Sequence, residues 1–554
     1  MFENLNPKFE NLDFAIFGIY ALIILFMGIF IGKGKKGEKK NAEEYFLAGK
    51  SLPWWAIGSS LIAANISAEQ FIAMSGSGFA VGLAVASYEW MAAITLIIVG
   101  KYFLPIFIKQ GIYTIPEFVE RRFNTNLKTI LAIFWIGLYI FVNLTSVLYL
   151  GAKALDTIVG LGNGELIMPF IIGMALFALA YSITGGLSSV AMTDVIQVVL
   201  LIVGGLITTY IALENVTPEG GIFNGLSHIY ENATNTINGK EVSKFHMILD
   251  RDNPEYDNLP GIAVLLGGMW VANLYYWGFN QYIIQRALAA KSLNEAQKGI
   301  AFAAYLKLIV PLLVVIPGII AAVMYKENTH NAIEALTKAN GGIDYDRSYP
   351  WLIDTFLPVG IKGLVVAALT AAIVSSLASM INSTSTIFTM DIYKPFINKS
   401  ATDGKLVNIG RLAGVFALII AMSLAKFMGS IDQMFQYIQE YTGLVSPGIL
   451  AVFLMGLFWK KTNTQGAIIG VISSIIIALI LKFIPTKVPF MEQMLYTIIS
   501  TIVIIIGVSL TTSDTDDDPK AIRLTKNIFK TNSKFNIASY VILLITAALY
   551  VIFW

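Results

Sequence analysis

Apolar residues occur along this chain in continuous runs of about twenty, separated by short polar connections. A run of that length crosses the roughly 30 Å hydrocarbon core of a bilayer as a helix. The runs are continuous and do not alternate with polar residues, which favours helices over the strands of a barrel. The pattern therefore predicts an all-α polytopic membrane protein whose helices contact the lipid bilayer. The fourteen predicted spans are 14–32, 54–78, 81–107, 128–157, 166–184, 191–213, 260–286, 299–324, 360–394, 407–427, 433–458, 465–485, 491–512 and 536–554.

The basic residues of the connections predict which side of the membrane each connection faces, because Lys and Arg accumulate in cytoplasmic loops. Every second connection is basic or neutral, and the others are short or acidic, as in 214–258. An even number of spans then places both termini outside the cytoplasm. The basic connections contain, in chain order, Lys33, Lys35, Lys36, Lys39 and Lys40; Lys109, Arg121 and Arg122; Arg286, Lys291 and Lys298; Lys394, Lys399 and Arg411; Lys460 and Lys461; Arg523, Lys526 and Lys530.

Composition supports this class and excludes several others. The 554 residues are 56% hydrophobic and 13% charged, whereas a soluble domain has about 25% charged residues. A net charge of +2 gives no reason to expect a nucleic-acid partner. Cysteine is absent, which excludes disulfides and thiolate chemistry, and the three histidines do not cluster. No phosphate-binding GxxxxGK[ST] motif is present to indicate ATP use. We therefore expect neither an enzyme nor an organic cofactor.

The second span contains the stretch AANISAEQFIAMSGSG, residues 63–78, which is too polar for a helix that faces lipid. Burying an unpaired amide or carboxylate costs several kcal/mol. One interpretation is a helix that unwinds inside the bundle and offers free carbonyls to a ligand. The other is an intact helix packed through small residues, with Ser and Asn bonded to neighbouring helices.

A second interrupted segment, VANLYYWGFNQYI at residues 271–283, shares features with the first. Ala-Asn-Ile followed by Gln-Phe-Ile in the first has its counterpart in Ala-Asn-Leu followed by Gln-Tyr-Ile in the second. Each segment opens a block of five spans, 54–213 and 260–458. An odd number of spans makes the second block enter the membrane from the opposite side. Interrupted helices at matching positions of two inverted halves indicate the central site of a transporter.

Ionisable and hydroxyl side chains also lie within predicted spans. Glu89 and Lys307 are functional candidates because charges at membrane depth are costly, although a structural ion pair is the alternative. Together with the amides of Gln436 and Gln439 they suit a polyhydroxylated solute. Ser375 and Ser376 follow Ala372 by one helical turn, which allows either a Na⁺ site of oxygen ligands or a packing stripe of small residues.

Five stretches of the chain resemble the sodium:solute symporter family, within it most closely the sodium/glucose cotransporter branch and its bacterial galactose-transporting members. They are EEYFLAGKSLPWWAIGSSLIAANISAEQFIAMSGSG, YTIPEFVERRF, ANLYYWGFNQYIIQR, AAIVSSLASMINSTSTIFTMDIYK and FQYIQEYTGLVSPGILAVFLMGLFWKK. The resemblance implies a LeuT-type fold of five-plus-five inverted repeats with a broken first helix in each. The implied organisation is an extra helix and basic loop at 1–50, a first repeat at 51–213, an outer loop at 214–259, a second repeat at 260–459 and three further helices at 460–554.

The resemblance also implies roles for individual residues. Na⁺ would bind the carbonyls of Ala63, Ile66 and Ala372 and the hydroxyls of Ser375 and Ser376. The sugar would meet Gln70, Glu89, Asn273, Lys307 and Gln439. Tyr276 would stack on the sugar ring as the inner gate, held by Asn65 and beside Trp277, while Met74, Tyr88 and Phe435 would close the outer side. Asp194 would lie on the Na⁺ exit path, and Ala92 replaces a serine of the galactose-transporting pattern.

The predicted function is Na⁺-driven import of a monosaccharide of the galactose or glucose type across a bacterial plasma membrane. Within the same fold the solute is alternatively a nucleobase, an amino acid or a vitamin. A proton-translocating subunit also carries Lys and Glu at mid-membrane, but we would expect it to have more than one buried Lys. A solute sensor would need a signalling domain, and no connection in this chain is long enough for one.

Overall fold

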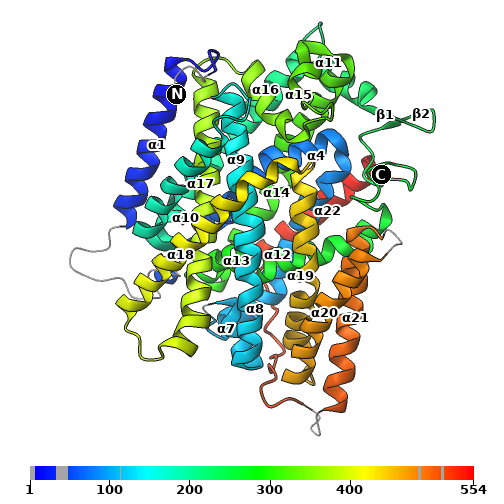
Figure 1. Ribbon diagram of the computed structural model, residues 1–554. Coiled ribbons are helices and arrows are strands. Elements are labelled where there is room, and N and C mark those ends of the chain that lie inside the picture. The colour runs from blue at the N-terminus through cyan, green and yellow to red at the C-terminus, as the bar shows by residue number, and fades with distance from the viewer. Residues whose placement is uncertain (1–5, 33–47, 113, 485–487, 513–516) are drawn as a thin grey trace.

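The structure is a computed structural model that describes residues 6–32, 48–112, 114–484, 488–512 and 517–554. Most helices run along the long direction of the molecule (Figure 1). The helix α11 (Ile222–Asn232), the hairpin of β1 (Thr234–Ile237) and β2 (Lys240–Ser243), and the start of α1 (Asn11–Gly32) lie toward one end. The short helix α7 (Ile115–Arg122) lies toward the other.

Long apolar helices form the body of the molecule. Besides α1 they are α5 (Ser87–Ile98) with α6 (Leu104–Lys109), α8 (Thr125–Gly137) with α9 (Thr145–Ile158), α10 (Ile167–Asn215), α14 (Leu293–Glu327), α17 (Ile361–Ile387), α18 (Asp403–Ala425), α19 (Met434–Phe458), α20 (Thr464–Phe483), α21 (Phe490–Thr511) and α22 (Ser533–Ile552). π-helical turns join α5 to α6 and α8 to α9. Five helices begin at a side chain that accepts a backbone N–H three residues later, the usual N-cap arrangement; these are Thr114, Asn124, Ser292, Asn463 and Asn532.

The predicted spans correspond to observed helices. Within the described residues, ten helices are long and apolar enough to cross a membrane, and Asn11–Ile24 and Ile167–Ala180 are shorter apolar helices. The two interrupted segments, α3 (Trp54–Asn65) with α4 (Ser75–Ala80) and α12 (Met269–Phe279) with α13 (Gln281–Leu288), complete the predicted fourteen. The predicted spans 166–184 and 191–213 both lie within α10. The basic cluster at Lys33–Lys40 lies outside the described residues.

Close backbone contacts pack α14 against both halves of the first interrupted segment. A Cβ on Gly299 would lie 2.9 Å from the carbonyl oxygen of Trp54, and a Cβ on Gly58 would lie 2.7 Å from that of Gly299. Farther along, a Cβ on Gly78 would lie 2.8 Å from the carbonyl oxygen of Val315. Glycine is therefore required at these positions, because small residues allow the helix backbones to approach this closely.

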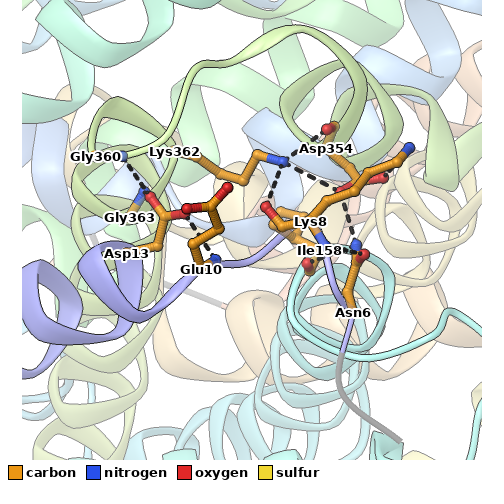
Figure 2. Close-up of polar contacts among 9 residues, drawn as sticks. All are labelled: Asn6, Lys8, Glu10, Asp13, Ile158, Asp354, Gly360, Lys362 and Gly363. Atoms are coloured by element: carbon orange, nitrogen blue, oxygen red, sulfur yellow. Dashed lines mark hydrogen bonds and ion pairs between the residues drawn. The ribbon is translucent and has the colours of Figure 1, made fainter.

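A polar network fixes the N-terminal end of α1 (Figure 2). The Asp13 carboxylate accepts the backbone N–H groups of Gly360 at 2.7 Å and Gly363 at 2.8 Å, and it thereby places a negative charge at the N-terminus of α17. The Lys362 ammonium donates to the Asp354 backbone carbonyl at 2.8 Å. Asp354 belongs to α16 (Ser348–Phe356), which follows the short α15 (Ala332–Leu336). The network therefore joins three segments that are far apart in the sequence.

The loop at 214–258 contacts the turn that follows α4. The buried Lys244 ammonium donates to the carbonyls of Phe79 at 2.9 Å and Ala80 at 2.8 Å. Its own carbonyl accepts the N–H of Leu83 at 2.7 Å. Gly82, which lies between Ala80 and Leu83, has a φ of +94°, and a side chain there would collide with Lys244. Lys244 therefore caps the C-terminal end of α4.

Candidate binding site at the helix breaks

Both interrupted segments are broken where polar residues enter the apolar runs. Helix α3 ends at Asn65, Ile66 is extended (φ −76°, ψ 91°), and a π-helical turn resumes at Glu69. Helix α12 ends at Phe279, and Asn280 is extended (φ −84°, ψ 119°) before α13. The prediction of broken helices is confirmed for both segments, and the alternative of an intact helix packed through small residues is wrong for the first.

A cavity of about 50 Å³ lies beside the two breaks. Its walls come from α3, α5, α12, α14, α19 and α21, and therefore from both predicted repeats and one helix beyond them. All of the predicted sugar contacts and gate residues line it: Gln70, Glu89, Asn273, Lys307, Gln439, Tyr276, Trp277, Asn65, Met74, Tyr88 and Phe435. Ala92 also lines the cavity. The fold thus brings together residues separated by almost 400 positions, while their roles stay predictions.

Two of the three ionisable residues that line the cavity, Glu89 and Lys307, form an ion pair, and the third is Glu69. The ammonium of Lys307 contacts the carboxylate of Glu89 and the side-chain carbonyl of Asn65, with 1% of the Lys307 side chain and 3% of the Glu89 side chain exposed. The same ammonium lies 5.2 Å from the centre of the Trp277 ring. Partnered in this way, the two charges avoid the large penalty of an isolated buried ion.

Hydrogen bonds and ring contacts connect the aromatic residues of the cavity. The Asn65 amide donates to the Tyr276 hydroxyl at 3.1 Å, and the Tyr282 hydroxyl donates to the same oxygen at 2.9 Å. The Trp277 ring meets the Tyr276 ring edge-on, with centroids 5.1 Å apart. The Tyr88 and Phe435 rings form a similar pair at 4.9 Å. These contacts close the cavity around a small volume.

The predicted sodium ligands lie where α17 passes the first break. The Ser376 hydroxyl lies 3.3 Å from the carbonyl oxygen of Ala64 and 3.5 Å from that of Ala63. Ile66 and Ala372 are fully buried on the same two segments. The available donors are all oxygens, as a hard cation such as Na⁺ prefers.

Asp194, the predicted exit-path residue, is part of a buried network. Its carboxylate accepts the hydroxyls of Ser60 and Ser375, each at 2.5 Å. The Arg286 guanidinium lies 3.6 Å from the same carboxylate and donates to the hydroxyls of Ser60 and Ser379, both at 2.7 Å. The prediction that Arg286 belongs to a basic connection is wrong. Arg286 lies in α13, and 1% of its side chain is exposed. A carboxylate partner 92 positions away is what allows this charge to be buried.

Five residues that line the cavity have no role assigned from the sequence: Glu69, Ala272, Thr442, Gly443 and Met494. Glu69 belongs to the polar stretch at 63–78 and was therefore marked by its composition. Thr442 and Gly443 follow Gln439 on α19. Met494 lies on α21, outside both predicted repeats, and an apolar residue in an apolar helix carries no signal that would single it out.

Comparisons with known proteins point to one family. The profile of the sodium:solute symporter family matches residues 45–474. The chain is 62% identical to a sodium/glucose cotransporter of Vibrio parahaemolyticus over 555 aligned positions, which cover 100% of each protein. It is 34% identical to a sodium/myo-inositol cotransporter of Bos taurus over 83% of this chain and 65% of that protein.

The fold resembles that of a solved transporter structure. A Na⁺-coupled sialic acid symporter in a substrate-bound outward-open state superposes with a TM-score of 0.76 at 23% identity, covering 91% of this chain and 98% of that one. At this identity the likeness concerns the fold alone. The predicted all-α membrane architecture of the LeuT type is confirmed.

Proposed function

The chain belongs to the sodium:solute symporter family, and from this premise we propose that it imports a monosaccharide of the galactose or glucose type together with Na⁺. The family is one of Na⁺-coupled transporters, so the protein is a multi-pass membrane transporter and not an enzyme. The observation that carries the choice of a sugar is the cavity at the breaks, where a carboxylate, an ammonium and several amides converge. The 62% identical sodium/glucose cotransporter supports the same choice.

The cavity chemistry suits a polyhydroxylated ring. In the proposal, the amides of Gln70, Asn273 and Gln439 both donate and accept hydrogen bonds, so they match hydroxyl groups in any orientation. Glu89 accepts from sugar hydroxyls and Lys307 donates to them. The ring of Tyr276 covers the apolar face of the sugar.

The cavity volume supports a gated mechanism. A volume of about 50 Å³ holds only a few water molecules, since each needs at least about 10–15 Å³. A monosaccharide therefore cannot enter until lining side chains move. We assign the outer movement to Met74, Tyr88 and Phe435 and the inner one to Tyr276 with Asn65 and Trp277. Such alternation between two closures gives access from one side at a time.

The binding of Na⁺ and the binding of sugar are energetically coupled in the proposal. In the proposal, the carbonyls of Ala63, Ile66 and Ala372 and the hydroxyls of Ser375 and Ser376 bind Na⁺ between the first break and α17. Fixing the break favours the conformer that binds sugar, and by linkage sugar favours the conformer that binds Na⁺. Inward movement of Na⁺ contributes about 2.3 kcal/mol per charge for each 100 mV of membrane potential.

Release and orientation complete the proposal. Asp194 would receive Na⁺ on its way to the cytoplasm, because its carboxylate contacts the proposed ligand Ser375. The alternating charge of the connections supports a plasma-membrane protein of bacterial type with both termini outside. The start of α1 lies toward the same end as the long loop at 214–258 (Figure 1).

Uptake into proteoliposomes tests the function. Labelled galactose and glucose should accumulate under an inward Na⁺ gradient and should not do so when K⁺ replaces Na⁺. Absence of Na⁺-dependent uptake of both sugars would contradict the proposal. A panel of unlabelled nucleobases, amino acids and vitamins added as competitors would then identify a non-sugar solute of the same fold.

A further inference from the structure

A second cavity, of about 250 Å³, lies at the end of the molecule that carries α7, away from the hairpin and α11 (Figure 1). One wall is formed by Gln110, Ile112, Phe118, Arg121 and Arg122, and the other by residues 520–523 between α21 and α22. Four of its lining residues are cationic: Arg121, Arg122, Lys520 and Arg523. The alternating charge pattern assigns both connections to the cytoplasmic side.

Arg122 is a fixed wall of this cavity and not a mobile surface charge. Its residue is 2% exposed, and its guanidinium donates to the backbone carbonyls of Gly456 at 3.0 Å and Thr462 at 2.7 Å. A third contact, at 3.2 Å, reaches the carboxylate of Asp518. The contacts connect α7 with the ends of α19 and α20 and with the segment after α21. The cavity is therefore built from converging elements of the fold.

The charges around the cavity do not balance within the described part of the chain. Arg122 is paired with Asp518 and Arg121 with Glu117. The Lys520 ammonium donates to the backbone carbonyl of Phe123, and its charge also acts on the Glu120 carboxylate, which is ion-paired with Lys128. For Arg523 the described residues provide no hydrogen-bond or acidic partner. Among the described residues, Arg523 and the Lys520 charge that Glu120 only partly offsets thus remain beside the cavity. Glu120 and Asp517, the nearby acids, are paired with Lys128 and Lys460 outside it.

We propose that this cavity binds a phosphate group, carried either by an anionic phospholipid of the cytoplasmic leaflet or by a free phosphate. Guanidinium groups match phosphate oxygens in a planar, two-pronged geometry, and Lys adds a point charge. Basic pockets at the cytoplasmic ends of membrane helices are suited to lipid head groups. The apolar residues Ile112 and Phe118 in the same wall offer a surface for the glycerol and first methylenes of a lipid. This site is separate from the transport cavity and does not depend on which solute the protein carries.

Binding measurements on the purified full-length protein in a neutral detergent test this site. Short-chain phosphatidylglycerol, short-chain phosphatidylcholine and inorganic phosphate are titrated separately by calorimetry. Each basic residue near an anionic group contributes a factor of about five to affinity, so Lys520→Gln with Arg523→Gln should weaken binding about twenty-five-fold. Lys526→Gln with Lys530→Gln removes the same charge from the same connection outside the cavity and should leave the affinity unchanged.

Each outcome decides one question. Binding of phosphatidylglycerol without inorganic phosphate identifies a lipid head group, and binding of both identifies the phosphate group itself. The charge-conserving pair Lys520→Arg with Arg523→Lys should retain binding, which separates loss of charge from loss of folding. Equal affinity for phosphatidylglycerol in the wild type and the Gln pair, or equal affinity for phosphatidylcholine and phosphatidylglycerol, would overturn the proposal.

Discussion

The side-chain amide of Asn65 donates a hydrogen bond to the hydroxyl of Tyr276 at 3.1 Å, and this contact joins the two broken helices directly. Asn65 is the last residue of α3, and Tyr276 lies one turn before the break in α12. Both residues line the transport cavity. Any movement that opens the cavity on the side of this pair must therefore separate the two residues or carry both together.

Two substitutions of Tyr276 distinguish the contribution of its ring from that of its hydroxyl. Tyr276→Phe loses the bonds to Asn65 and Tyr282, worth about 0.5–1.5 kcal/mol each, but keeps the ring. We expect sugar affinity within a few-fold of wild type and a changed rate of transport. Tyr276→Ala should weaken sugar binding itself. Equilibrium binding and initial uptake rates distinguish the two, and equal effects of both substitutions on affinity would exclude the ring contact.

Breaking the Glu89–Lys307 pair should destabilise the protein. Lys307→Met leaves the Glu89 carboxylate buried without its cation, at a cost of about 3–5 kcal/mol. The double substitution Glu89→Met with Lys307→Met removes both charges and should recover most of the stability. Thermal unfolding in detergent measures this recovery. Sugar uptake should stay absent in the double variant, and restored uptake would show that the pair is structural only.

Ser376→Ala should weaken the dependence of uptake on sodium. The substitution removes a hydroxyl beside the carbonyls of Ala63 and Ala64. A single oxygen ligand worth about 0.5–1.5 kcal/mol corresponds to a rise of up to about tenfold in the half-saturating Na⁺ concentration. Ser383→Ala, a buried serine two turns farther along α17, is the matched control and should leave it unchanged. Wild-type sodium dependence in Ser376→Ala would refute the assignment.

Position 92 is expected to tune sugar preference. Ala92 lines the cavity where the galactose-transporting pattern carries a serine. Ala92→Ser adds one hydroxyl that can bond a sugar hydroxyl, which is worth about 0.5–1.5 kcal/mol. The ratio of galactose to glucose affinity should therefore change by a few-fold up to about tenfold. Competition uptake assays measure this ratio, and an unchanged ratio would place the serine out of contact with the sugar.

Lys244 makes stability depend on pH in the alkaline range. Burial, together with the nearby charge of Lys326, lowers the pKa of Lys244 from 10.5 to about 8. Between these values the unfolded chain binds the proton and the folded protein does not, so this group makes stability rise with pH. The rise is about 1.4 kcal/mol per pH unit between about 8 and 10.5. The neutral amine still has two protons for the carbonyls of Phe79 and Ala80.

Lys244→Met tests this linkage. The variant should be less stable, because two carbonyls lose their donor. Its stability should also lack the increase with pH that Lys244 gives the wild type between about pH 8 and 10.5. Chemical unfolding of both proteins across pH 7.5–10.5 measures the difference. Parallel stability curves would show that Lys244 keeps an ordinary pKa in the folded protein.

Much of the site was predictable because its residues are unusual for their surroundings. Asn65, Glu69 and Asn280 are polar groups in apolar runs, and each lies at or next to an observed break. Glu89 and Lys307 were marked by the cost of a charge at membrane depth. The sequence left open whether they form an ion pair, since their separation of 218 positions carries no distance information.

Other features required the folded structure. Arg286 follows a polar segment, so the sequence predicts a loop residue. In the structure it lies beside Asp194. Lys244 lies in a loop whose sequence shows no pattern, yet its position is set by the turn at Gly82. Met494 enters the cavity because α21 packs there. In each case the partner is distant in sequence, and local composition does not reveal it.

The glycine contacts of α14 decide which parts of the molecule travel together. With no side chain between their backbones at Gly299, Gly58 and Gly78, α14 and both halves of the first broken segment have no room to slide past one another. We therefore expect α14, α3 and α4 to move as one rigid unit, which includes the contact between Lys307 and Asn65. A movement that opens the cavity should then occur at another boundary, such as the contact between α17 and the first break. A bulky residue at Gly299 would collide with α3 at Trp54 and push the two helices apart, at a position that does not line the cavity.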